Sequence, residues 1–331
     1  MTRAERGPQE GYVTRLLGRD VASLQRKGDI VRLTTAAGHK RDAVRVSAIT
    51  ALGELKDPDA LPAIITGLHD PMRKVRQAAV TSLTRIPSAD ATTYLQESLT
   101  DPSVEVRSAA VEGLHTTAVD KSIVPTLGEA IRSSNTVGRR VLTEDFLENQ
   151  FPKSFSHDTG DRIRTGFIDS GDERRAEAQA DAVLTQMNSA ALDIASELGM
   201  RHAYGLVLDI YDLLSYREAQ GTVRQKAAVL LANAIEKAKE ENTTDARFLL
   251  IKLAERTKGD LQLSAVDALT EVGIPVPPTV VLHNDFQSTK DDYFDRVAAR
   301  GLPAPDGLIE VARNDPEVDW FVLHGQGGHY V

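Results

Sequence analysis

The sequence contains no cysteine. This absence excludes disulfide bonds, thiolate catalysis and the common structural zinc sites, all of which depend on cysteine sulfur. Aromatic residues are also scarce, at 5% of the chain, although 41% of the residues are hydrophobic. A core with so few rings is built mainly from aliphatic side chains, and this composition suits helices rich in alanine and leucine.

Long hydrophobic runs are absent as well. No stretch approaches the roughly 20 apolar residues that a membrane-spanning helix needs. The longest candidate runs from Leu206 to Leu214 and is interrupted by Asp209 and Asp212. The segment from Thr2 to Glu10 is polar, so it does not have the basic and then apolar pattern of a leader peptide. We therefore expect a cytoplasmic protein with no membrane partner.

The net charge of −9 lacks the basic surplus that is usual in nucleic-acid-binding proteins. The charge is uneven, because residues 1–45 carry ten basic and five acidic side chains. A nucleic-acid-binding solenoid that uses this basic block is therefore the alternative reading of the chain. Its candidate phosphate contacts are four basic residues: Arg15, Arg19, Arg26 and Lys27.

An internal repeat is the main positive signal. Three Val-Arg pairs recur 31 residues apart: Val44-Arg45, Val75-Arg76 and Val106-Arg107. In the second copy the apolar residues Val75, Ala79, Val80 and Leu83 fall at i, i+4, i+5 and i+8. This spacing indicates one face of an amphipathic helix, since a strand would alternate every second residue.

Each repeat also contains a second, shorter helical pattern, as in residues 59–68 and 91–99. Asp-Pro pairs at Asp70-Pro71 and Asp101-Pro102 mark the turn between the two helices, because aspartate accepts bonds from free helix amides and proline fits a first helical turn. Each unit is therefore a helix hairpin. A hairpin of about 30 residues cannot bury its apolar face alone, so the units must stack into an all-α solenoid.

The motif Asp-Pro-x-x-x-Val-Arg-x-x-Ala-Val-x-x-Leu, read at Asp70–Leu83 and Asp101–Leu114, resembles the HEAT repeat in the short form named after phycobilisome lyases. The resemblance covers about residues 40–118. His39 replaces the turn aspartate in the first copy, and Val137-Gly138-Arg139 stands where the fourth Val-Arg pair would be. The resemblance implies a structural ladder in which each arginine reaches the turn aspartate of a neighbouring unit; its members are Arg45, Arg76, Arg107, Asp70 and Asp101.

The chain divides into four parts by composition. Residues 1–150 form the HEAT-like repeat block, and residues 151–175, rich in Pro, Gly, Ser and Asp, are predicted to be a linker. Residues 176–273 regain helical patterning and are predicted to be a degenerate repeat block. Residues 274–331 begin with a proline-broken segment and are predicted to be a terminal cap or a docking tail.

Some proteins with this repeat are enzymes, and their catalysis requires particular residues. Deoxyhypusine hydroxylases need repeated His-Glu pairs for a di-iron centre, and none of the eight histidines here is followed by glutamate. A lyase-like or metal-dependent enzyme stays as a third reading. Metal-ligand residue types gather only near the C-terminus, without tight helical spacing: His283, Asp285, Asp319, His324 and His329.

No catalytic group stands out elsewhere. Ser154, Ser156 and His157 are neighbours in sequence, but adjacency does not create a catalytic triad, and the chain has no Gly-x-Ser-x-Gly motif. We therefore expect no catalytic residues, no metal and no cofactor.

A partner surface can be predicted on the second helix of each unit from the positions that do not belong to its buried apolar face. The remaining positions are polar side chains that predict a shallow trough: Arg73, Gln77, Thr81, Thr84, Ser108, Glu112 and His115. Such a trough suits a protein or peptide better than a small metabolite. The sequence therefore favours a non-catalytic protein–protein interaction scaffold, an adaptor or a structural component of a larger assembly.

Overall fold

The computed structural model describes residues 20–86, 88–117, 119–150, 153–155, 162–164, 170–214, 221–276 and 280. The chain forms two compact units, Met1–Ile194 and Ala195–Val331. Helices dominate both units. Within these ranges strands occur only as a short antiparallel pair, β1 (Lys153–Phe155) and β2 (Arg162–Arg164), with Ser154 opposite Ile163.

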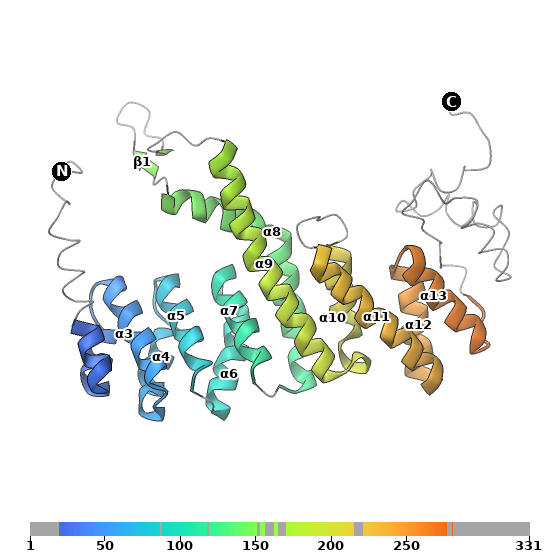
Figure 1. Cartoon of the computed structure of the whole chain (residues 1–331), viewed down its shortest axis with the longest axis horizontal. Helices are drawn as coiled ribbons and strands as arrows, with labels where there is room; N and C mark the ends of the chain where they lie inside the picture. The colour runs from blue at the N-terminus through green and yellow to red at the C-terminus, as the bar shows by residue number, and fades with distance from the viewer. Residues whose placement is uncertain are drawn as a thin grey trace. The chain divides into compact units, whose positions relative to one another are not determined.

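The first unit begins with a row of helix hairpins (Figure 1). Its helices in this row are α2 (Ile30–Ala37), α3 (Asp42–Leu55), α4 (Leu61–Gly67), α5 (Arg73–Leu83), α6 (Ala89–Glu97) and α7 (Val104–His115), with short 3₁₀ turns η1 (Pro58–Ala60) before α4 and η2 (Ser98–Thr100) after α6. α2 pairs with α3, α4 with α5 and α6 with α7, while α3, α5 and α7 pack side by side. The predicted all-α solenoid of HEAT-like hairpins is confirmed.

Aspartate side chains set the turns inside the hairpins. Oδ1 of Asp70 accepts a hydrogen bond from the Met72 N–H at 2.9 Å, and Oδ1 of Asp101 accepts one from the Ser103 N–H at 2.8 Å. In the first hairpin Nδ1 of His39 takes this place and accepts from the N–H two residues ahead, at 3.1 Å. The histidine therefore preserves the turn that its sequence seemed to break, because it offers an acceptor at the same position.

The repeated apolar columns form the core of this row. All nine members are at most 1% exposed: Ala48, Ala79, Ala110, Ile49, Val80, Val111, Leu52, Leu83 and Leu114. Small residues bring α3 and α5 into close contact, since a Cβ added at Gly53 would lie 2.5 Å from Cβ of Ser82. The hydroxyl of Ser82 donates to the Ile49 carbonyl at 3.0 Å and so satisfies a buried polar group at this crossing.

The fourth copy lacks the hairpin of the first three. The 3₁₀ turn η3 (Lys121–Ile123) leads into one continuous helix, α8 (Val124–Gln150). Residues 132–136 contain neither glycine nor proline, and no Asp-Pro pair interrupts them. Nothing in the local sequence therefore stops the helix.

The next helix, α9 (Ser170–Leu198), begins inside the segment predicted to be a linker. Ala180 and Leu184 of α9 pack against Leu142 of α8 and Val104 of α7 in one apolar cluster. The division between the two units accordingly falls at Ile194, within α9, and not in the 151–175 segment. Most of α9 belongs with the first repeats because its apolar face is buried against them.

The second unit contains two further hairpins, α10 (Met200–Leu213) with α11 (Gly221–Glu241) and α12 (Thr244–Arg256) with α13 (Gly259–Glu271). α11 also packs beside α13, as the second helices do in the first unit. The residues that resume the repeat's apolar spacing in the sequence are mostly buried here: Val223, Ala227, Leu231, Ala265, Val266 and Leu269. Ala228 and Leu261, which belong to the same pattern, are half-buried. The predicted terminal cap, 274–331, lies outside the described residues apart from 274–276 and 280.

None of the helices that the structure describes combines the length and the apolar character needed to cross a membrane.

Candidate functional site

Arg45 and Arg76 make the same set of hydrogen bonds in successive repeats. Nε and Nη2 of Arg45 donate to the carboxylate of Asp70 at 2.6 and 2.9 Å, and the same atoms of Arg76 donate to Asp101 at 2.8 and 3.0 Å. Nη1 of Arg76 also donates to the main-chain carbonyls of Asp70 and Pro71 in its own turn. Each aspartate is thus held by an arginine of the preceding repeat.

These ion pairs lie mostly out of solvent, with side chains 10–14% exposed. Burial acts to raise the pKa of Asp70, but hydrogen bonds from Arg45 and from the Met72 N–H outweigh it and hold that pKa below its usual value. Hydrogen bonds to the aspartates raise the pKa of Arg45 and Arg76. Both guanidinium groups make their bonds within the chain, so they do not form an anion site.

Arg107 departs from this pattern. Its Nη1 donates to the carbonyls of its own turn, Asp101 and Pro102, at 2.7 and 3.1 Å, as the other two arginines do. Its Nε, however, donates to Oγ of Ser134 on α8 at 3.0 Å, where the other two meet a carboxylate. The third arginine of the predicted ladder therefore has no aspartate partner among the described residues.

The bidentate pairing resumes one repeat later, at a residue that the sequence reading did not include. Nε and Nη2 of Arg139 donate to the carboxylate of Asp181 on α9 at 2.8 and 3.2 Å. Arg139 is the arginine of Val137-Gly138-Arg139, which lies 32 residues after Arg107. The position of Arg139 in the degenerate fourth copy could have indicated that it belongs to the ladder. Its partner Asp181 could not be predicted in this way, because it lies outside any repeat.

The predicted partner trough is only partly open on α5. Gln77 and Thr81 are exposed, whereas Arg73 and Thr84 are half-buried. Arg73 is paired with Asp145 of α8, and the Thr84 hydroxyl donates to the Thr81 carbonyl at 2.8 Å. The structure therefore leaves Gln77 and Thr81 facing solvent and ties Arg73 to another helix.

On α7 the predicted trough is partly covered. Ser108 is buried, and its hydroxyl donates to Glu112 at 3.2 Å. Gln186 of α9 donates to the other oxygen of Glu112 at 2.8 Å, while Nε2 of His115 lies 3.9 Å from a carboxylate oxygen of Asp193. Ser108 is therefore closed to a partner, whereas Glu112 and His115 are half-buried and contact α9.

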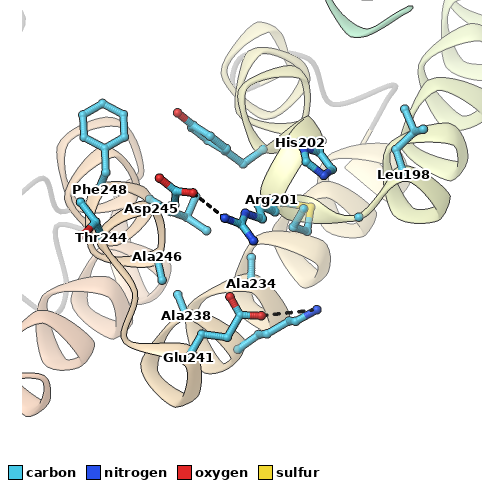
Figure 2. Close-up of a pocket in the computed structure, with 15 residues that line it drawn as sticks. Leu198, Arg201, His202, Ala234, Ala238, Glu241, Thr244, Asp245, Ala246 and Phe248 are labelled. Atoms are coloured by element: carbon cyan, nitrogen blue, oxygen red, sulfur yellow. Dashed lines mark hydrogen bonds and ion pairs between the residues drawn. The ribbon is translucent and has the colours of Figure 1, made fainter. Parts of the chain in front are cut away.

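The second unit contains a pocket of about 740 Å³ between α10, α11 and α12 (Figure 2). Helix ends create it. Gly199, at φ +82°, separates α9 from α10, and Asn242, at φ 43°, ends α11 before Thr243 caps α12 by accepting from the Ala246 N–H at 3.2 Å. The N-terminal ends of α10 and α12 and the C-terminal end of α11 therefore surround the pocket.

The pocket combines an apolar wall with paired charges. Ala238, Ala246 and Leu249 are buried along it, and Phe248 stands 50% exposed at its side. In Figure 2, Arg201 of α10 and Asp245 of α12 point toward each other, with 2.7 Å between Nη2 and Oδ2. Lys237 and Glu241 of α11 form a second pair at 3.8 Å. The charges balance in pairs, so the space suits an apolar side chain better than a charged metabolite.

The remaining predicted candidates are mostly outside the described residues. This holds for His283, Asp285, Asp319, His324 and His329, and also for Ser156 and His157. Ser154 lies in β1. Among the described residues, no group of three or more histidine, aspartate or glutamate side chains is arranged to hold a metal ion.

The basic block of the nucleic-acid alternative is described only in part. Arg15 and Arg19 lie outside the described residues. Arg26 and Lys27 are exposed, and Nε of Arg26 donates to the Ala22 carbonyl at 3.3 Å. These two residues do not form a phosphate site by themselves.

Comparison with known proteins gives one family match. Residues 30–115 match the family model described as HEAT repeats. No match was found among curated proteins. Two engineered proteins with crystal structures align at 19% identity and a TM-score of 0.32; the alignments cover 74% of this chain and 96% of the first, and 93% of this chain and 69% of the second. At that score neither alignment carries an argument about function.

Proposed function

We propose that this chain is a non-catalytic scaffold that binds a protein partner, because residues 30–115 match the HEAT-repeat family model. Stacked helix hairpins present extended surfaces of this kind. The proposal places the main contact in the pocket between α10, α11 and α12, with a peptide segment of the partner as its occupant. It also includes a cytoplasmic location and membership of a larger assembly.

The main support for the proposal is the position of Phe248. Phe248 is half-exposed beside a pocket of about 740 Å³, with Nζ of Lys252 5.5 Å from its ring centroid, so it offers apolar surface that a partner can cover. Aromatic residues beside pockets are typical anchors of protein interfaces. The paired charges of Arg201 and Asp245 would lie at the rim, where they set orientation more than affinity.

The contact surface on the first unit is proposed to be smaller than the sequence predicts. It contains Gln77 and Thr81 of α5 and leaves out Ser108, which is buried, and Glu112 and His115, which are half-buried and contact α9. Thr81→Arg would place a long charged side chain on this surface. If the surface contributes to binding, the variant weakens partner capture without lowering the thermal stability of the chain.

The proposal is tested by affinity capture of the full chain from cell extract, followed by mass spectrometry of what co-purifies. Phe248→Ser is the pocket variant. Val229→Ser is its matched control, because Val229 on α11 is 53% exposed and does not line the pocket. We expect a stoichiometric protein that is lost from Phe248→Ser and retained by Val229→Ser. Co-purification of nucleic acid alone, or turnover of a substrate by a partnerless chain, would contradict the scaffold.

A further inference from the structure

Arg107 is the one ladder arginine that meets a hydroxyl where its two equivalents meet a carboxylate. In Arg45 and Arg76 the Nη2 atom donates to the second oxygen of the aspartate. In Arg107 the Nε bond goes to Ser134, and Nη2 has no hydrogen-bond partner among the described residues. One donor edge of this guanidinium is therefore open.

The charge of Arg107 is also buried without an ion-pair partner. The residue is 8% exposed, and the structure shows no ion pair between it and any carboxylate in the described ranges. Burial lowers its pKa, although Asp101 and Glu105 act against this from a distance. Both of those carboxylates are engaged elsewhere, Asp101 by Arg76 and Glu105 by the Ser103 hydroxyl at 2.6 Å. A buried cation in this condition favours a bound anion.

Beside Arg107 lies a pocket of about 540 Å³, here called the Arg107 pocket. It lies between the turn that precedes α7 and the first turns of α8. Its lining includes hydroxyl groups and proline rings beside the guanidinium: Thr100, Thr126, Ser133, Pro102 and Pro125. Two acidic residues also line it: Asp101, whose carboxylate is paired with Arg76, and Glu129, whose side chain is 67% exposed and paired with Arg132.

We propose that the Arg107 pocket binds a carboxylate group supplied from outside the chain, with the open edge of the Arg107 guanidinium as its anchor. In the two preceding repeats the equivalent position holds an aspartate carboxylate of the chain itself, so the geometry around the arginine already fits this group. Glu129 at the rim disfavours a doubly charged phosphate relative to a singly charged carboxylate. The source is either an acidic side chain of a peptide or a small free carboxylic acid.

This site is independent of the α10–α12 pocket, and its test does not use the partner. The full chain is titrated with a capped Gly-Asp-Gly peptide, with succinate and with inorganic phosphate, against sodium chloride at equal ionic strength. Binding is followed by the ¹H–¹⁵N signal of Nε–H of Arg107. We expect a saturable shift with a carboxylate. Response to the peptide alone identifies an acidic peptide as the source, and response to succinate shows that a free acid suffices.

Ser134→Asp is the decisive variant, because it supplies the missing ladder carboxylate within the chain. We expect it to weaken carboxylate binding at least tenfold and to raise the melting temperature. Thr136→Asp is the matched control, since it adds the same charge at an exposed position of α8 and should leave binding unchanged. Arg107→Gln should also abolish binding if it folds.

Three results would overturn the proposal: no saturable shift with either carboxylate, equal binding by the wild-type chain and Ser134→Asp, or a response to phosphate alone. None of them bears on the Phe248 capture experiment, so the two proposals fail separately.

Discussion

Asn135 of α8 and Asn188 of α9 exchange side-chain hydrogen bonds in the interior of the first unit. Nδ2 of Asn135 donates to Oδ1 of Asn188 at 2.8 Å, and Nδ2 of Asn188 donates back at 3.1 Å. Both residues are at most 1% exposed. A buried amide pair of this kind is satisfied in only one alignment of the two helices, so it specifies how α9 lies on α8.

Removing one member of this pair should be costly. Asn188→Ala removes the two hydrogen bonds that Asn188 makes with the buried amide of Asn135, whose Nδ2 keeps its bond to the Ile131 carbonyl at 2.9 Å, and we expect the free energy of unfolding to fall by about 1–3 kcal/mol. Urea denaturation of the single variants and of Asn135→Ala/Asn188→Ala measures this. The double variant should lose less than the sum of the singles. Strict additivity would show that the two amides are not coupled, and Asn233→Ala on the exposed face of α11 serves as the control.

The Arg76–Asp101 pair should contribute more to stability than a surface ion pair. Arg76→Gln leaves a largely buried carboxylate without its counterion, and we expect a loss of about 2–4 kcal/mol. Arg32→Gln removes a solvent-exposed partner of Asp29 and should change stability by about 0.5 kcal/mol or less. Chemical denaturation of both variants provides the comparison. Equal losses would contradict the structural role of the ladder.

Gly53 should tolerate no side chain. A Cβ there would lie 2.5 Å from Cβ and 2.8 Å from Cα of Ser82, so Gly53→Ala must push α3 away from α5. We expect a loss of about 1–3 kcal/mol. Gly128→Ala is the matched control in α8, where the added methyl meets nothing within 4 Å, and it should stabilise by about 0.5–1 kcal/mol. The melting temperatures of the two variants should therefore move in opposite directions.

The ladder should make stability depend on acid pH through Asp70. Its folded pKa is below the unfolded value of about 3.9, so the folded state binds fewer protons in that range. Its contribution is present above the unfolded pKa and is lost as pH falls through the folded pKa. We expect Asp70→Asn to be less stable than wild type at pH 7 and the difference to shrink below about pH 4. A difference that is constant from pH 7 to pH 3 would rule out this linkage.

The repeated part of the fold could be predicted because periodicity fixes where side chains lie. Once Val75, Ala79 and Leu83 define the buried face of a helix, the direction of Arg76 follows. Its contact with the turn aspartate of the next unit was implied by the resemblance to HEAT repeats and not by the periodicity. The HEAT-repeat match over 30–115 coincides with this regular part. The turn at His39 was harder to predict, because histidine does not match the motif. Its Nδ1 nevertheless accepts a hydrogen bond from the N–H two residues ahead, as the turn aspartates do.

The candidate sites could not be predicted in the same way, because non-periodic contacts create them. Gln186 and Glu112 are 74 residues apart, and no repeat relates them, so the burial of the α7 face beneath α9 has no local signal. The α10–α12 pocket depends on the helix ends at Gly199 and Asn242, whose spacing follows no repeat. The missing aspartate beside Arg107 had a sequence signal, because the fourth copy contains no Asp-Pro pair, but the structure is needed to show that Ser134 takes its place.

The most direct measurement of the scaffold proposal is the dissociation constant of the stoichiometric partner for three forms of the purified chain: wild type, Phe248→Ser and Val229→Ser. Phe248 and Val229 are exposed to nearly the same extent, and only Phe248 lines the pocket. The proposal predicts at least tenfold weaker binding for Phe248→Ser and no change for Val229→Ser. Equal affinity of all three forms would show that the partner does not bind in the α10–α12 pocket.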